Sequence, residues 1–392
     1  GSSSIKYQLL NMDAVPVVLA KGIVEKIGLT YGSFTYKPEG KDKVVAEQPI
    51  MDHSVGMDLI LKALVHPDHG VLKSLNEIDA VGHRVAHGGE YFSESVKIDD
   101  EAKAKIKALG EIAPLHNPAN LMGINACMKL MPGVPNVAVF DTAFHQTMPQ
   151  SHYMYAVPYE YYEKYKIRRY GFHGTSHRYV TLRAAELLGK DPKDLKIVSC
   201  HLGNGSSLAA VDGGKCVDTS MGLTPLAGLP MGTRAGDMDV GVIEYVANKY
   251  DRSISSVMEG LNKRSGMMGL SGVSSDFRDL EAAAAKGHHR SAIALRIFEY
   301  RVHKMIAEYA AAMNGVDVVI FTAGVGENAP STRAHILEGL EFMGITCDEE
   351  KNNTRGEERI ISKDGAPVTV MVIPTNEELM IARDTKEVVE KL

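Results

Sequence analysis

The sequence is poor in cysteine, and the spacing of its cysteines argues against two kinds of site. The chain has four cysteines, which lie far apart, and no two of them form a Cys-x-x-Cys pair. Such spacing is typical of neither a zinc site nor a disulfide framework. We therefore expect free thiols in the core of a cytoplasmic protein at Cys127, Cys200, Cys216 and Cys347.

Long apolar runs and blocks of basic residues are also missing. No run approaches the roughly 20 apolar residues that a membrane-spanning helix needs, and no signal peptide is visible. The formal net charge is −6. Without a basic block, this acidic balance disfavours a nucleic-acid partner. We expect small-molecule ligands, and neither nucleic acid nor a membrane as a partner.

Two widespread nucleotide-binding motifs do not occur. The absence of Gly-x-x-x-x-Gly-Lys-Ser/Thr excludes the P-loop class, and no Gly-x-Gly-x-x-Ala opens a first βαβ unit, which disfavours a nicotinamide cofactor. A nucleoside triphosphate would therefore have to be held by glycine-rich hairpins.

The length of 392 residues predicts two or three domains at about 150 residues each. Strand-like segments alternate with helical patterns, which indicates mixed α/β layers. Turn residues place a domain boundary within 141–149. Expected strands cover residues 78–85, 136–140, 196–202, 207–211, 316–322 and 368–373. Expected helices cover residues 119–130 after an Asn117 cap and Pro118, a stretch from a Thr175 or Ser176 cap to Gly189, and residues 289–313.

The most informative segment is 197–211, where Asn204-Gly205 separates two apolar runs. Asn-Gly favours a tight hairpin because both residues tolerate φ > 0, and such a turn leaves backbone N–H groups and the hydroxyls of Ser206 and Ser207 free to face an anion. The alternative is an ordinary Asn-Gly hairpin.

A similar tip, Gly1-Ser-Ser-Ser, stands at the start of the chain and runs into a strand that carries Lys6, a cation in reach of the same anion. The alternative is a residual expression tag. Two such hairpins predict two copies of one domain type. Residues 318–328 form another candidate, because a buried strand there ends in a glycine turn before a helix from Ser331. Open α/β sheets bind nucleotides at such turns, and we expect close approach to a ligand at Gly324 and Gly326.

Two arginines and an aspartate are candidates for anion chemistry. Arg84 lies in Gly82-His-Arg-Val-Ala-His-Gly-Gly-Glu90, and Arg234 in Gly232-Thr-Arg-Ala-Gly-Asp-Met-Asp239. A guanidinium binds a carboxylate or phosphate bidentately and keeps its charge, although a surface salt bridge is the alternative. Asp141 follows a strand at its C-terminal end, where functional carboxylates are common, or it caps the next turn.

The histidines indicate phosphate binding more than metal binding. His173 and His177 are four residues apart, but no His-Glu-x-x-His pattern occurs, which disfavours zinc. His173, within Gly171-Phe-His-Gly-Thr-Ser-His177, is the best candidate for a hydrogen bond to phosphate. The other histidines considered are His83, His87, His116, His145 and His201.

Taken together, these motifs resemble the acetokinase family. The matching segments, which span essentially the whole chain in order, are Gly-Ser-Ser-Ser-x-Lys, Gly-His-Arg-Val-x-His-Gly-Gly-Glu, Ala-Pro-Leu-His-Asn-Pro, Phe-Asp-Thr-Ala-Phe-His, Tyr-Gly-Phe-His-Gly-Thr-Ser-His, His-Leu-Gly-Asn-Gly-Ser-Ser and Phe-Thr-Ala-Gly-x-Gly-Glu-Asn. The resemblance implies a duplicated actin-like (ribonuclease H-like) fold of mixed sheets flanked by helices, with a ligand cleft between the domains. Residues 1–143 plus 376–392 would form the N-terminal domain, to which the last helix returns, and residues 144–375 the nucleotide-binding domain. The implied reaction is reversible phosphoryl transfer from ATP to acetate, giving acetyl phosphate and ADP, with Mg²⁺ or Mn²⁺, usually in a homodimer.

The resemblance also assigns roles to single residues. Arg84 corresponds to the arginine that holds the substrate carboxylate, and Asp141 to the active-site aspartate. His173 and Arg234 match the pair that stabilises the transferring phosphoryl group. Lys6 matches a phosphate-binding lysine, and Glu377 a magnesium ligand. The nucleotide segments are His201, Leu202, Gly203, Asn204 and Gly205; Asp276, Phe277 and Arg278, which serve adenine and ribose; and Gly324, Val325, Gly326, Glu327 and Asn328. The acyl pocket is lined by Ala86, Leu115, Phe172 and Pro225.

The chain departs from the family pattern at two places. Members begin with an apolar strand that ends in a magnesium-contacting Asn before the Gly-Ser-Ser-Ser tip, and the given sequence starts at the Gly. If that strand is absent from the molecule, we expect weaker Mg²⁺ binding and an exposed strand edge in the first domain, and intact mass settles the point. At Ala86 the family commonly has Val, so propionate kinase is the nearest alternative. An actin-like ATPase without a metabolite acceptor is a further alternative, but it leaves Arg84 beside a small apolar pocket unexplained.

Overall fold

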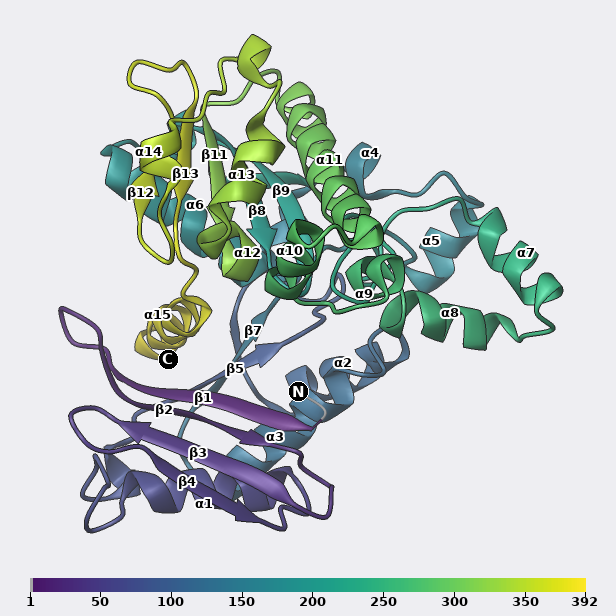
Figure 1. Cartoon of the computed structure of the whole chain (residues 1–392). Coiled ribbons are helices and arrows are strands. Elements are labelled where there is room, and N and C mark those ends of the chain that lie inside the picture. Colours follow the sequence, from purple (N-terminus) through teal and green to yellow (C-terminus); the bar gives the residue numbers. More distant parts are fainter. Residues whose placement is uncertain (1–2) are drawn as a thin grey trace. The chain divides into compact units, whose positions relative to one another are not determined.

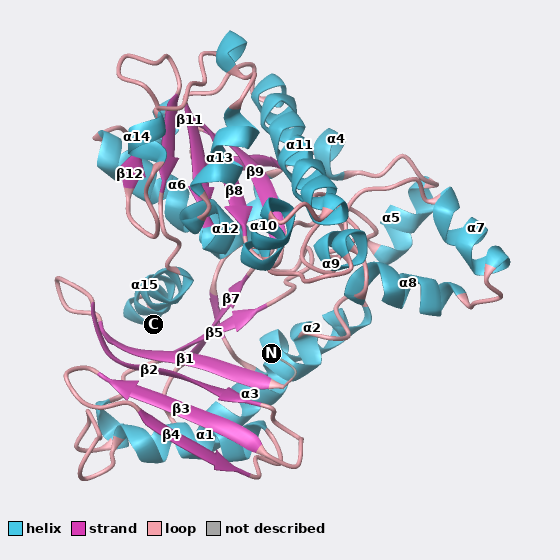
Figure 2. Cartoon of the chain, in the orientation of Figure 1, coloured by secondary structure: helices cyan, strands magenta, loops and turns pink. Residues whose placement is uncertain are grey.

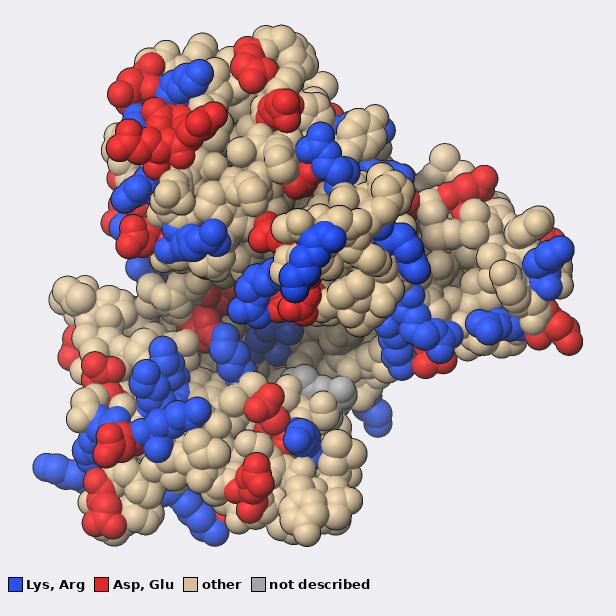
Figure 3. Space-filling view, viewed as in Figure 1, with Lys and Arg blue, Asp and Glu red and all other residues tan. Residues whose placement is uncertain are grey.

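The computed structural model of the chain describes residues 3–392. Its contacts divide the chain into two compact units, unit 1 with Gly1–Ala143 and Asn376–Leu392, and unit 2 with Phe144–Thr375. Both units combine sheets with helices (Figures 1 and 2), which confirms the expected mixed α/β layers. Lys and Arg side chains and Asp and Glu side chains both occur on the visible faces of the units, with large uncharged areas between them (Figure 3).

Unit 1 contains an antiparallel sheet in which neighbouring strands follow chain order. Its strands are β1 (Ser4–Asn11), β2 (Val17–Glu25), β3 (Gly32–Pro38) and β4 (Val44–Gln48). Phe34 and Tyr36 alternate with more exposed residues and point into the core, where the helix α1 (His53–Leu64) packs against them. Among the described strands β1 pairs only with β2, so it is an edge strand. Gly1 and Ser2 of the expected phosphate-binding tip lie outside the described residues.

A second sheet of unit 1 carries candidate site residues at its strand ends. β5 (Val81–Val85) and β6 (Val96–Lys97) flank β7 (Asn136–Phe140), which is parallel to β5 and wholly buried. The helices of this part are α2 (Asp100–Ala108), α3 (Asn117–Leu130) and the C-terminal α15 (Glu377–Glu390). α15 packs on β5 and β7. Gly82 permits this approach, because a Cβ there would lie 2.3 Å from Thr385 Oγ1.

Unit 2 is built on a mixed sheet with the strand order β10-β9-β8-β11-β13-β12. The strands are β8 (Lys196–Leu202), β9 (Ser206–Asp212), β10 (Lys215–Thr219), β11 (Val318–Thr322), β12 (Arg359–Ile360) and β13 (Thr369–Val372). Helices cover both faces. In β11, Val319 and Phe321 pack with the long helix α11 (His289–Ala312), whereas Val318 and Ile320 pack on the side of α6 (Gly174–Leu188). This two-sided burial explains the unbroken apolar run of β11.

The remaining helices of unit 2 are shorter. They are α4 (Gln150–Tyr153), α5 (Tyr159–Tyr165), α7 (Gly241–Lys249), α8 (Ile254–Lys263), α9 (Gly266–Ser271), α10 (Phe277–Ala285), α12 (Ala323–Asn328), α13 (Pro330–Leu337) and α14 (Glu349–Asn352). Among residues 3–392, no helix has the length and apolarity to cross a membrane.

Two helix starts differ from the sequence prediction. His116, not Asn117, caps α3. His173, not Thr175 or Ser176, caps α6, with a left-handed backbone at φ 56°. In both cases the expected capping residue uses its side chain for tertiary hydrogen bonds, which we describe below.

Candidate active site

Arg84 and Asp141 form an ion pair at the ends of two parallel strands. The register that pairs Val85 with Phe140 brings Asp141, the next residue, alongside Arg84. The Arg84 Nε donates to Asp141 Oδ1 at 3.0 Å, and Nη2 donates to Oδ2. The Asp141 side chain is 1% exposed, whereas that of Arg84 is 46% exposed. The guanidinium is therefore anchored by a buried carboxylate and still open to a second anion.

Further charged residues join this group from β1 and from the start of α15. Lys6, the predicted phosphate ligand, forms an ion pair with Glu378. Burial and the Asp141 carboxylate raise the pKa of Glu377 to about 7, and the nearby Arg84 opposes this rise. The Asp141 carboxylate also raises the pKa of Arg84. Unit 1 thus holds two neighbouring carboxylates that repel each other.

The carboxylates of Asp141 and Glu377 suit a magnesium ion. Mg²⁺ prefers oxygen ligands and usually takes one or two protein carboxylates together with substrate phosphates. A cation would also relieve the repulsion that raises the pKa of Glu377. Within residues 3–392, no group of three or more His, Cys, Asp or Glu side chains is arranged to hold a metal ion.

The expected hairpin in unit 2 is formed by β8 and β9, but its turn differs from the prediction. Leu202 pairs with Ser206, so the loop consists of Gly203, Asn204 and Gly205. Neither Asn204 nor Gly205 has a positive φ. The predicted left-handed Asn-Gly turn is therefore wrong, because the longer loop reverses the chain without it.

Gly205 lies beside two candidate catalytic side chains. A Cβ on Gly205 would lie 3.4 Å from Cε1 and Nε2 of His173 and 3.5 Å from Nη1 of Arg234. On its other face, the His173 ring stacks on His201 at a centroid distance of 4.1 Å. The structure therefore brings the hairpin tip, His173, His201 and Arg234 together.

Arg234 is a cation without a carboxylate partner among residues 3–392. Its Nη1 donates to Pro225 O at 3.2 Å, and burial lowers its pKa. The loop that carries it is fixed to the hairpin tip, because Gly232 N donates to Asn204 O at 3.0 Å. A guanidinium held beside a glycine loop in this way can bind a phosphate group.

The two serine hydroxyls after the tip do not face an anion, which corrects the prediction for them. Ser206 Oγ donates to Gly203 O at 2.9 Å and closes the loop. Ser207 Oγ lies 2.9 Å from His173 Nδ1 and 2.9 Å from His177 Nε2. Both serines are fully buried. Their hydroxyls therefore hold the loop and the two histidines in place.

Comparisons with known proteins identify the chain. The model of the acetokinase family matches residues 1–383. The acetate kinase of Thermoanaerobacter pseudethanolicus is 58% identical over 393 residues, covering 100% of this chain and 98% of that protein. The chain belongs to the acetokinase family.

Solved structures agree with this membership. The crystal structure of Porphyromonas gingivalis acetate kinase is 49% identical, with a TM-score of 0.96, and covers 99% of this chain and 98% of its own. That of a propionate kinase from Francisella tularensis is 42% identical, with a TM-score of 0.92, and covers 99% and 97%. The acetokinase resemblance of the sequence motifs is confirmed.

The third glycine-rich segment of this acetokinase is a short helix, α12, and not the turn that was predicted. It begins at Ala323, whose φ of 63° is unusual for a residue with a side chain. Gly324 is exposed, and a Cβ there would meet no atom within 4 Å. Gly326 is buried, and a Cβ there would lie 3.3 Å from the carbonyl carbon of Phe321. Packing against the sheet therefore leaves little room for a side chain at Gly326.

Two charged residues that support α12 are Glu327 and Arg333. Glu327 Oε1 accepts from Ala323 N at 2.7 Å, so the predicted nucleotide residue also shapes its own helix. Arg333, which the sequence analysis missed, is fully buried and donates to the carbonyl oxygens of Gly326 and Thr354 at 2.8 and 2.9 Å. A buried arginine satisfied by carbonyl groups holds these segments in register.

The predicted adenine and ribose segment lies at the start of α10. Asp276 caps the helix by accepting from Arg278 N at 2.9 Å, and the Arg278 guanidinium folds back onto the same carboxylate. The Arg278 side chain is 89% exposed. Phe277 is buried in an edge-to-face contact with Phe298. The two polar side chains are therefore accessible to a ligand.

The residues predicted for the acyl pocket are divided between the units. In unit 1, Ala86 is buried and its N–H donates to Asn120 Oδ1 at 3.0 Å, whereas Leu115 is 67% exposed. In unit 2, Phe172 packs with Met221 and Met231, and Pro225 accepts the hydrogen bond from Arg234.

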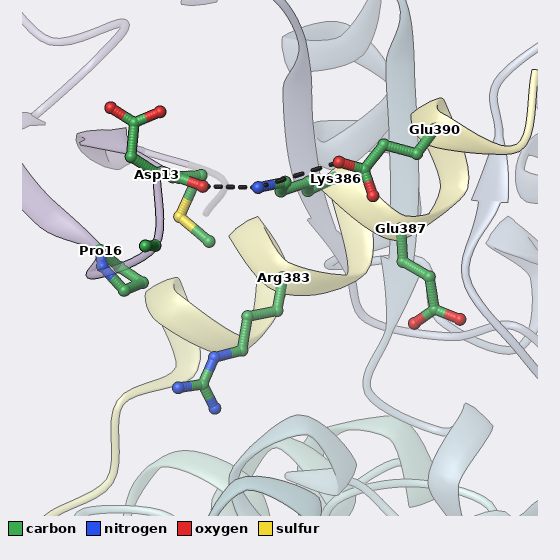
Figure 4. A pocket seen from close by; sticks show the side chains of 8 residues that line it. Asp13, Pro16, Arg383, Lys386, Glu387 and Glu390 are labelled. Atoms are coloured by element: carbon green, nitrogen blue, oxygen red, sulfur yellow. Dashed lines mark hydrogen bonds and ion pairs between the residues drawn. The ribbon is translucent and has the colours of Figure 1, made fainter.

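An open pocket of about 290 Å³ lies in unit 1 between α15 and the loop after β1 (Figure 4). Lys386 spans it and donates to Met12 O at 2.7 Å. Its lining includes no predicted site residue. The lining residues are Met12, Asp13, Ala14, Pro16, Arg383, Lys386, Glu387 and Glu390.

The sequence analysis also missed the support of His173. His177 lies one helical turn after it, and the spacing of four residues indicates a shared helix face. That spacing was considered only for zinc. In the structure, His177 Nδ1 lies 2.8 Å from Ser199 Oγ, and Ser207 links the two histidines.

Proposed function

We propose that this protein transfers the γ-phosphoryl group of ATP to acetate, reversibly, giving acetyl phosphate and ADP. The observation that carries the proposal is the half-exposed Arg84 guanidinium backed by the buried Asp141. This arrangement stands in a chain that is 58% identical over its length to an acetate kinase. A fork with one free edge suits a small carboxylate.

Acetate needs no general base. Its pKa of about 4 to 5 means that it is already ionised at neutral pH, so its oxygen attacks without losing a proton. We therefore assign to Asp141 the fixing of Arg84, and to Arg84 the orientation of acetate. The remaining difficulty is the repulsion between two anions, which positive charge and alignment overcome.

We assign phosphate binding to unit 2. Arg234 and His173 beside Gly205 would stabilise the transferring phosphoryl group, supported by the hairpin tip. Half-buried Asp276 and exposed Arg278 would bind adenine and ribose, and exposed Gly324 would face the nucleotide. Arg84, which we assign to the acetate carboxylate, belongs to unit 1. Unit 1 also contains Lys6, which we assign to a further contact with a substrate phosphate.

We assign Mg²⁺ to Glu377 with Asp141 nearby, because these carboxylates fit the preference of the ion. When bound, Mg²⁺ neutralises charge on the phosphates. Glu377, at the start of α15, would then be held ionised, and Arg84 would keep Asp141 in place.

Trapping of the product tests the proposal. Purified protein with ATP, Mg²⁺, acetate and hydroxylamine is expected to give acetyl hydroxamate and ADP in equal amounts. ADP formation that does not depend on acetate, without hydroxamate, would instead indicate an actin-like ATPase and would overturn the proposal.

Propionate is the second candidate acceptor. The Francisella tularensis propionate kinase has a TM-score of 0.92 to this structure, and the small, buried Ala86 leaves room for a larger acyl group. The values of kcat/KM for acetate, propionate and butyrate decide between the two activities.

We further propose a cytoplasmic homodimer. Its thiols are free and mostly buried, which suits a reducing compartment. The α7 to α8 region exposes Val240, Tyr245, Tyr250 and Ile254 by 64 to 77%, and such apolar patches often form interfaces. Sedimentation equilibrium of the protein and of a Tyr245→Glu variant tests the dimer, since a monomeric wild type contradicts it.

A further inference from the structure

A row of side chains within hydrogen-bonding distance leads from His173 into the core of unit 2. His173 Nδ1 lies 2.9 Å from Ser207 Oγ, which lies 2.9 Å from His177 Nε2. His177 Nδ1 lies 2.8 Å from Ser199 Oγ. The last three residues of the row are fully buried. Their polar atoms must therefore form hydrogen bonds with one another.

The outer end of the row is directed at the proposed phosphate site. A Cβ on Gly205 would lie 3.4 Å from His173 Nε2 and 3.5 Å from Arg234 Nη1, so both side chains are adjacent to the hairpin tip. The His173 ring is held on one face by His201, and Ser176 Oγ in turn lies 2.8 Å from His201 Nδ1. His173 Nδ1 therefore belongs to the row, and Nε2 lies beside the tip.

The buried end limits the number of protons in the row. Burial, together with the neighbouring His145 and His201, lowers the pKa of His177 well below its usual value. His177 is therefore neutral at pH 7 and has one ring N–H. Ser207 also has one hydroxyl hydrogen. When Ser207 donates to one of the two histidines, it can only accept from the other.

Two arrangements of hydrogens satisfy the row. In the first, His177 Nε2–H donates to Ser207, and Ser207 donates to His173 Nδ1, so the hydrogen of a neutral His173 is on Nε2. In the second, His177 Nδ1–H donates to Ser199, Ser207 donates to His177, and His173 Nδ1–H donates to Ser207. A charged His173 requires the second arrangement and again carries a hydrogen on Nε2. Nε2 is therefore a donor whenever His173 is charged, and it is a donor in a neutral His173 when the row adopts the first arrangement.

We propose that Ser207 and His177 are positioning residues that keep His173 Nε2 a hydrogen-bond donor toward the phosphoryl group in transfer. This inference rests on the proposed function. A fixed donor stabilises the charge on the phosphoryl oxygens in the transition state. The bond to the ADP oxygen breaks as the bond to the acetate oxygen forms, and His173 neither gains nor loses a proton.

The tautomer of His173 tests the row without any need for activity. In protein labelled with ¹⁵N-histidine, the His173 signals are assigned by their loss in His173→Gln. We expect a protonated Nε2 and an unprotonated, hydrogen-bonded Nδ1 in the neutral wild-type ring. In Ser207→Ala the ring is expected to become a mixture of tautomers. An unchanged tautomer in Ser207→Ala overturns the proposal.

Kinetics test the role in catalysis. Ser207→Ala is expected to lower kcat about tenfold or more, with KM for ATP and acetate within about twofold, because only the transition state loses its oriented donor. The matched control is Ser220→Ala, which also removes a buried hydroxyl, one that accepts from Leu208 N at 2.9 Å and contacts no histidine of the row. The control is expected to keep wild-type kcat.

A conservative variant adds a rescue test. His177→Gln retains an amide N–H near the position of Nε2, so it should keep more activity and more of the Nε2–H tautomer than His177→Phe. Equal loss in both variants indicates a packing role for His177 and contradicts the proposal. If the wild type forms no acetyl hydroxamate, the proposed function fails. If it does, and Ser207→Ala shifts the tautomer without a fall in kcat, only the positioning role fails.

Discussion

Glu327 and Thr375 are joined by a hydrogen bond from Thr375 N to Glu327 Oε1 at 3.1 Å. The same oxygen accepts from Ala323 N at 2.7 Å. Ala323 has a left-handed backbone, with φ 63°, and such strain persists only where the surroundings enforce it. One carboxylate therefore fixes both the start of α12 and the chain segment after β13.

Glu327→Ala is expected to lower the free energy of unfolding by about 1–3 kcal/mol, because two backbone donors lose their acceptor. Glu327→Gln retains an acceptor oxygen and should lose less. Urea unfolding measures both. Glu338→Ala, an exposed substitution beside α13, is the control and should change stability by less than about 0.5 kcal/mol. An equal free energy of unfolding in all three variants would show that the Glu327 carboxylate does not stabilise these two segments.

Arg84→Ala is expected to reduce kcat/KM for acetate by more than about a hundredfold, since it removes the proposed carboxylate fork. It should also lower the free energy of unfolding by about 1–3 kcal/mol by leaving Asp141 unpaired, less than for a fully buried pair because the Arg84 side chain is 46% exposed. Arg84→Lys should recover part of the kcat/KM for acetate and part of the stability, because a lysine ammonium keeps the charge but cannot bind a carboxylate bidentately.

The readouts for Arg84 are initial rates with acetate as the varied substrate, and urea unfolding. Lys62→Ala, which breaks an exposed ion pair with Asp58, serves as the control and should change neither quantity appreciably. Wild-type kcat/KM in Arg84→Ala would contradict the acceptor assignment.

Arg234→Ala is expected to lower turnover by about two to three orders of magnitude with a modest change in ATP affinity, because the guanidinium acts on charge that develops during transfer. Rates at saturating substrates give kcat, and calorimetric titration gives the Kd for ATP. The control is Arg290→Ala, which also removes a guanidinium of unit 2. Arg290 donates a hydrogen bond to Leu270 O. Near-normal turnover would refute the role of Arg234.

Stability should fall as the pH falls below about 6.5. Burial lowers the pKa of His145 to about 4 and that of His177 well below its usual value. Between pH 6.5 and 4 the unfolded chain therefore binds more protons than the folded one, so acid favours unfolding. At about 1.4 kcal/mol per pKa unit, His145 alone contributes a loss of roughly 3 kcal/mol by pH 4.

Urea unfolding at a series of pH values, for the wild type and for His145→Gln, isolates this effect from that of the carboxylates. The variant should be less stable at pH 7, because His145 lies 2.8 Å from Phe172 O, yet it should lose less stability on acidification. Parallel pH profiles would show that His145 is not the source.

The sequence predicts a feature of this structure well when neighbouring residues determine it, and poorly when contacts with distant segments determine it. The strands β7 and β8 match the predicted ranges, because continuous apolar runs between turn residues leave little choice. The cap of α3 does not match. Asn117 accepts from His87 N at 3.1 Å and donates to His87 O at 2.9 Å, so its side chain is not available for capping.

The candidate site shows the same division. The sequence motifs named Arg84, Asp141, His173 and Arg234, since charged residues among glycines are a local signal. The pairing of Arg84 with Asp141 follows from the strand register, and Ser207 was assigned to an anion because its histidine partners belong to another element. Contacts between distant elements carry no periodic pattern from which they could be derived.

Ala86→Val is expected to narrow the choice of acyl substrate. Ala86 is 4% exposed, one residue after the strand that carries Arg84, so added methyl groups would take space beside the proposed carboxylate fork. A change of this size is worth about 1–3 kcal/mol in discrimination, which corresponds to a fall of roughly 5- to 150-fold in kcat/KM for propionate relative to acetate. Competition between the two acids at equal concentration measures the ratio directly. An unchanged ratio would place the acyl pocket away from Ala86, while a fall for both acids alike would indicate a general disturbance of β5 and not a change in specificity.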